Sequence, residues 1–97
     1  MIININGLRF IRTGIANPET YEVKIYENEN NNLVGYISLR WGIITCKYPN
    51  KAGQQIYIHN FYDVWKGEFE DEIERQKYLK ICAEEINKKL VNGSNVN

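Results

Sequence analysis

The sequence holds little of the material from which catalytic and metal sites are built. Its 97 residues include one histidine and two cysteines, and neither cysteine belongs to a C-x-x-C pair. The ligand spacing of a structural zinc site is therefore missing. The glycines are scattered singly, and neither a G-x-x-x-x-G-K-S/T nor a G-x-G-x-x-G motif occurs. We predict no metal site, no cofactor and no nucleotide bound through a glycine-rich loop.

Long hydrophobic runs and net charge are absent as well. No stretch approaches the ~20 apolar residues that span a bilayer, and the N-terminal MIININGLRF lacks the basic flank of a secretory signal. We expect a cytoplasmic protein without a membrane partner, in which Cys46 and Cys82 are free thiols; a disulfide between them is the alternative. The formal net charge is zero, so the basic excess typical of proteins that bind duplex DNA is missing.

Residue periodicity predicts a sheet followed by a helix. Asn6-Gly7 lies between two short apolar runs and favours a tight hairpin turn, residues 13–20 resemble a loop, and alternating segments at 21–26, 33–41, 43–48 and 55–59 predict further strands. Asp71 and Glu74 suit a helix N-cap. After them, apolar residues recur with helical spacing, at Leu79, Cys82, Ala83, Ile86 and Leu90.

These patterns together predict one α+β domain over residues 1–92. It has an antiparallel sheet of about five strands, built from hairpins, with one C-terminal helix packed on one face. Residues 93–97 are expected to form a flexible tail.

Catalysis has one constellation to consider. Cys46, His59 and Asp63 offer a thiolate, a base and an orienting carboxylate, but their spacing does not show that they converge. His59 and Asp63 alone are too few ligands for a metal. A chain this short also has little room to enclose a substrate cleft. We therefore predict that the protein is not an enzyme and that it has no catalytic residues.

The segment QQIYIHNFYDVWKGEFEDEIE, from Gln54 to Glu74, is rich in both aromatic and acidic residues. One small core cannot bury all of these rings while the acids between them stay hydrated. We therefore predict a small protein-binding module of the inhibitor or accessory type, whose partner has a basic surface. The predicted contact residues are Tyr57, His59, Phe61, Tyr62, Asp63, Trp65, Glu68, Glu70 and Asp71. A competing interpretation places Trp65 and Phe69 in the junction between the last strand and the helix.

Single-stranded nucleic acid is the alternative partner. Tyr26, Tyr36 and Arg40 fall on strand faces opposite the more apolar rows, and aromatic and basic residues on an open sheet are what some modules use to stack bases. Glu22 lies on the matching face and the RNP signature is absent, which weighs against this alternative. The sequence does not define an oligomeric state.

Overall fold

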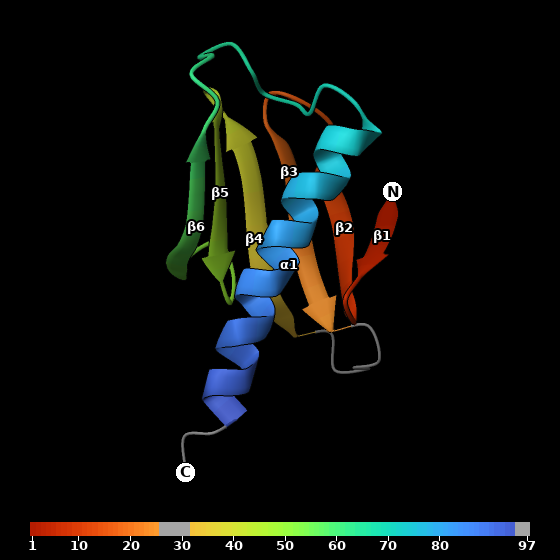
Figure 1. Cartoon of the computed structure of the whole chain (residues 1–97), viewed down its shortest axis with the longest axis vertical. Helices are drawn as coiled ribbons and strands as arrows, with labels where there is room; N and C mark the ends of the chain where they lie inside the picture. Colours follow the sequence, from red (N-terminus) through yellow and green to blue (C-terminus); the bar gives the residue numbers. More distant parts are fainter. Residues whose placement is uncertain (26–31, 95–97) are drawn as a thin grey trace.

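A computed structural model describes residues 1–25 and 32–94 of the chain. Six strands precede one helix: β1 (Ile2–Ile5), β2 (Leu8–Gly14), β3 (Glu19–Ile25), β4 (Leu33–Arg40), β5 (Ile43–Tyr48), β6 (Gln54–Asn60) and α1 (Glu72–Ser94). The strands form one antiparallel sheet in the order β1 to β6, so each strand pairs with its neighbour in sequence (Figure 1). The predicted α+β fold is confirmed, and its sheet has six strands where about five were expected.

Two hairpins turn through two-residue connections with positive φ at both positions. Asn6 and Gly7 have φ values of 52° and 80°, and Trp41 and Gly42 have values of 56° and 72°. Such left-handed pairs match the right-handed twist of the flanking strands. The turn predicted at Asn6-Gly7 is confirmed, whereas Trp41, expected to continue a strand, occupies a turn.

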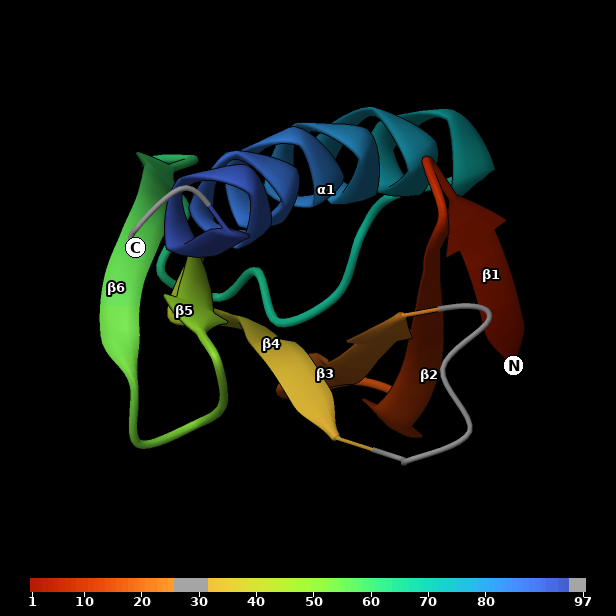
Figure 2. The ribbon, with the colours of Figure 1, turned by 90° about the horizontal axis from the view of Figure 1, so that it is seen from below.

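The helix covers one face of the sheet (Figure 2). Alternate strand positions point toward it, and the apolar stripe predicted for the helix supplies the other half of the core. The largest fully buried side chains in this core include Leu8, Phe10, Tyr21, Ile37, Leu39, Ile44, Leu79 and Ile86. The described chain places no second layer on the opposite face of the sheet.

The helix begins where the sequence predicts. Asp71 Oδ1 accepts the N–H of Glu74 at 2.8 Å, and the Glu74 carboxylate accepts the N–H of Glu70 at 2.9 Å. The helix then continues to Ser94, so the first two residues of the predicted tail are helical. Residues 95–97, like Tyr26, lie outside the described residues. Within the described ranges, no helix is both long and apolar enough to cross a membrane.

Candidate functional site

Three connections meet at one end of the sheet: the β2–β3 loop, the β4–β5 turn and the β6–α1 loop (Figure 1). Backbone hydrogen bonds tie them together. The N–H of Gly42 donates to the Lys66 carbonyl at 2.8 Å, and the N–H groups of Asn17 and Glu19 donate to the Gly67 carbonyl at 2.9 and 2.8 Å. Because each bond joins two different connections, each loop holds its neighbour in place.

This close contact between backbones depends on two glycines. A Cβ at Gly42 would collide with the Asp63 carbonyl, and a Cβ at Gly67 would collide with Asn17 Oδ1. Gly42 also has a positive φ, which a residue with a side chain adopts only with strain. The sequence therefore permits the three loops to pack as one unit.

These fixed loops expose large apolar side chains. The exposed fraction is 62% for Trp41, 90% for Tyr62, 62% for Val64 and 85% for Trp65. We call these four residues the aromatic end. Trp41 and Tyr62 also have left-handed backbones, with φ values of 56° and 57°, a region that bulky residues rarely occupy. Because most of each ring is exposed, these rings add little to the core.

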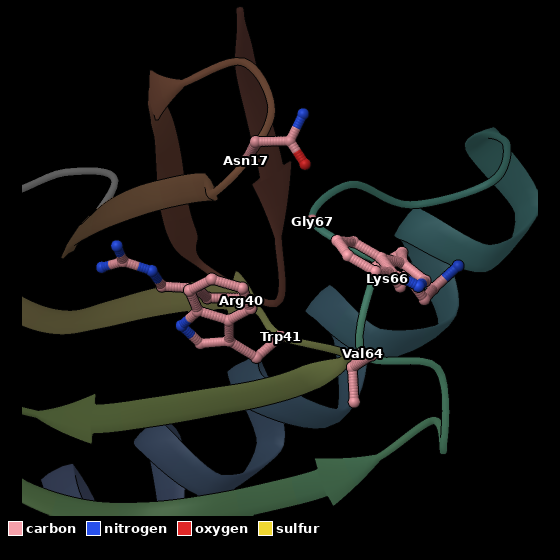
Figure 3. A pocket seen from close by; sticks show the side chains of 7 residues that line it. Asn17, Arg40, Trp41, Val64, Lys66 and Gly67 are labelled. Carbon is pink, nitrogen blue, oxygen red and sulfur yellow. The ribbon is translucent and has the colours of Figure 1, made fainter.

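A shallow cavity of about 150 Å³ lies within this surface. Its lining residues are Asn17, Arg40, Trp41, Val64, Trp65, Lys66 and Gly67 (Figure 3). We call it the indole pocket, because two tryptophans line it. Sites for drug-sized ligands are typically about 300–1,000 Å³, so the indole pocket is better suited to a single side chain than to a substrate or cofactor.

Both cationic side chains that line the indole pocket lie near aromatic rings. The Lys66 ammonium lies 2.7 Å from the Glu74 carboxylate and 5.0 Å from the centre of the Phe61 ring. The Arg40 guanidinium lies 5.6 Å from the centre of the Trp41 ring, and it makes no ion pair with the described residues.

Acidic side chains lie beside the aromatic end, in the loop that leads from β6 to α1. Asp63 accepts the N–H of Trp65 at 3.1 Å. Glu68, Glu70 and Asp71 are exposed, and none of them forms an ion pair within the described part of the chain. Since Glu74 neutralises Lys66, this rim carries net negative charge.

No known protein family, curated protein sequence or solved structure matches this chain. Function is therefore inferred from the arrangement of the site alone.

Some predicted contact residues are partly buried against the helix. His59 and Phe61 pack around Tyr78, with ring centres 5.2 and 4.9 Å from it, and the Tyr78 hydroxyl lies 3.4 Å from His59 Nε2. Tyr57 is also partly buried on this side, and burial raises the pKa of its phenol. Phe69 is buried and stacks on Tyr78 at 6.1 Å. The competing interpretation thus holds for Phe69, while Trp65 is exposed.

The residues of the hypothetical catalytic constellation have separate surroundings. Cys46 and Cys82 are buried free thiols, as expected. Cys82 lies outside the constellation; its hydrogen bond with Cys46, which stabilises the neutral Cys82 thiol, and its burial raise the pKa of that thiol, which leaves it a poor nucleophile. His59 contacts the rings of Phe61 and Tyr78, and no hydrogen bond between it and Asp63 is found among the described residues.

A buried ionic cluster beneath the aromatic end was missed by sequence reasoning. Glu19 is fully buried and accepts hydrogen bonds from Tyr21 O–H at 2.5 Å, Arg75 Nε at 2.8 Å and Phe69 N–H at 3.0 Å. Arg12 lies 3.3 Å from the same carboxylate. Burial alone would raise the pKa of Glu19, but the hydrogen bonds from Arg75, Tyr21 and Phe69 outweigh it, and the pKa is lowered. The cluster thereby anchors the β6–α1 loop and the helix to β3.

Proposed function

We propose that the protein is a small non-enzymatic binding module whose aromatic end contacts a partner protein with a basic surface, in the manner of an inhibitor or accessory protein. One observation carries this proposal: Trp41 occupies a left-handed turn position and still leaves most of its ring exposed. Tryptophan, tyrosine and arginine dominate the energetics of protein interfaces. All three occur at the aromatic end and its pocket, in Trp41, Trp65, Tyr62 and Arg40.

Rigidity supports a role in binding. Each interface side chain that is immobilised on association costs about 0.5–1.5 kcal/mol, and ordering a loop adds to this. Backbone hydrogen bonds already fix the loops that present Trp41 and Trp65. Association therefore has to order the exposed side chains but not the backbone of these loops.

The size and charge of the site define the partner further. The indole pocket accommodates one apolar side chain as an anchor, and the acidic rim of Asp63, Glu68, Glu70 and Asp71 favours lysine or arginine beside that anchor. Opposite charges of this kind mainly raise the association rate, and the gain falls with added salt. The partner surface is thus expected to combine an exposed apolar side chain with neighbouring basic residues.

The test compares partner capture by matched variants. Trp41→Gly removes one ring while keeping a residue that tolerates positive φ, and Trp65→Ala removes the second. Ile73→Ala is the control, because Ile73 is also exposed but lies on the helix outside the aromatic end. The wild-type and control chains should capture the same basic protein from host extract, and purified complexes should bind at least about thirty-fold more weakly with either tryptophan variant.

Charge reversal provides the second arm of the test. Glu68→Lys with Glu70→Lys leaves the Asp71 cap intact and should slow association by about tenfold at low salt, with a smaller effect at high salt. Equal capture by the wild-type chain and by both tryptophan variants would reject this surface. A captured partner without a basic surface, or no captured protein at all, would reject the proposed partner class.

A further inference from the structure

The open face of the sheet is a second surface, on the side of the sheet that the helix does not cover (Figure 2). The alternating burial along β3, β4 and β5 shows that every second side chain points away from the helix. The cross-strand register places four of them in one row across β2 to β5, namely Ile11, Glu22, Tyr36 and Lys47. Tyr36 therefore lies in the middle of the sheet on its uncovered side.

Basic residues gather on this face. Arg9, Lys24 and Lys47 lie on its strands, and Lys51 lies in the β5–β6 turn. Arg40, at the end of β4, borders both this face and the indole pocket, and we assign it no role in binding at this face. Among the described residues, Glu22 is the only acidic residue at the outward-facing strand positions. Lys24, Arg40, Lys47 and Lys51 form no ion pair with any described residue.

The cations lie close together on neighbouring strands. Arg9 lies directly opposite Lys24 in the β2–β3 ladder. A surface that concentrates positive charge is suited to a polyanion. The zero net charge of the chain conceals this concentration, because six of its twelve acidic residues lie between Asp63 and Glu74.

Tyr36 adds a stacking surface among these cations. It lies directly opposite Lys47 in the β4–β5 ladder, and the Lys51 ammonium lies 5.8 Å from the centre of its ring. Aromatic rings on a positively charged surface are what proteins use to bind single-stranded nucleic acid, since bases stack on the ring while lysines contact phosphates. Duplexes keep their bases stacked on one another and offer no free base face to Tyr36.

We propose that the open face of the sheet binds single-stranded nucleic acid, with a base stacked on Tyr36 and phosphates held by Lys24, Lys47 and Lys51. The proposal is independent of the proposed function, because it rests on another face with the opposite charge. If three phosphates are neutralised, the logarithm of affinity should fall with the logarithm of salt with a slope of about −2 for a single strand. That slope gives a loss of about 15- to 20-fold between about 50 and 200 mM salt.

Fluorescence anisotropy with labelled single-stranded oligonucleotides tests the proposal. Lys47→Glu should weaken binding by at least tenfold at low salt and make the salt slope shallower. Tyr36→Val, which keeps a strand-forming residue, should weaken binding at least about fivefold and leave the slope unchanged. Lys80→Glu is the matched control, since Lys80 is exposed on the helix and carries the same charge change; its effect should stay within twofold. Thermal unfolding of each variant confirms that the fold is retained.

Any one of the following results would overturn the proposal. The first is a failure of single strands to bind at low salt, and the second is equal weakening of binding by Lys80→Glu and Lys47→Glu. Another is binding of the matching duplex or dextran sulfate at least as tight as that of the single strand. The last is self-association of the protein at low salt that Lys47→Glu abolishes. The last would show that the basic face meets the acidic rim of a second copy. Trp65→Ala separates the two proposals: it should leave oligonucleotide binding unchanged, and a loss would place the nucleic acid at the aromatic end.

Discussion

Replacing Arg75 with methionine tests how strongly the buried Glu19 cluster supports the fold. The substitution removes the 2.8 Å bond from Arg75 Nε to a carboxylate that is fully buried. Breaking a buried ion pair by removing one partner typically costs about 3–5 kcal/mol. Arg12 remains 3.3 Å from the carboxylate and the Tyr21 and Phe69 hydrogen bonds persist, so we expect the lower end, about 3 kcal/mol.

Such a loss is large for a domain of this size. Domains of about 100 residues are stable by about 5–15 kcal/mol, and each kcal/mol shifts the melting temperature by about 4–8 °C. Arg75→Met should therefore melt about 12–24 °C below the wild-type chain. Urea and thermal unfolding followed by far-UV circular dichroism measure both quantities.

Two companion variants make the result specific. Lys88→Met breaks the exposed Lys88–Glu85 pair and should leave the unfolding midpoint unchanged. Adding Glu19→Gln to Arg75→Met removes the uncompensated charge and should recover part of the loss, because the two sites are coupled. If Arg75→Met unfolds at the same urea concentration as Lys88→Met, the buried carboxylate does not depend on Arg75, and the reasoning is refuted.

Three further predictions concern the same end of the molecule. The pKa of Glu19 is held below its ordinary value of 4.5. Its ionised form therefore stabilises the fold above that pH, and this contribution is lost as the pH falls through the lowered pKa. Glu19→Gln should flatten the dependence of the urea midpoint on pH in this acidic range. Phe69→Ala should cost about 3–5 kcal/mol of unfolding free energy, whereas Trp65→Ala should change it by less than about 0.5 kcal/mol. Equal losses would contradict the assignment of Phe69 to the core and Trp65 to the surface. Gly42→Ala should cost at least about 1 kcal/mol in urea unfolding, and an unchanged midpoint would show that the turn tolerates a Cβ beside the Asp63 carbonyl.

Local patterns were sufficient to predict the fold because the sheet is a meander. Each strand pairs with the strand next to it in sequence, so two-residue periodicity and turn residues carry most of the topology. Asn6-Gly7 is the clearest example, since that dipeptide adopts the left-handed turn on which the β1–β2 register depends. The helical stripe from Leu79 to Leu90 likewise follows from spacing alone.

Features that depend on distant contacts escaped prediction. Glu19 and Arg75 are far apart in sequence, and no spacing rule links a residue in a predicted loop to one on a helix. Trp41 alternates correctly for a strand, so only the three-dimensional structure reveals that it occupies a turn. Phe69 and Trp65 lie in a connection without periodicity, and which ring is buried depends on where the loop crosses the edge of the sheet.

The same reasoning explains why net charge says little about the partners of this chain. The sum of zero includes both an acidic rim beside the aromatic end and a group of basic residues on the open face of the sheet. Electrostatic attraction falls off within about 8–10 Å at physiological salt. A ligand at either surface therefore responds mainly to the charges nearest to it. On the two proposals, a basic protein and a single-stranded polyanion are expected to bind different faces of one neutral molecule.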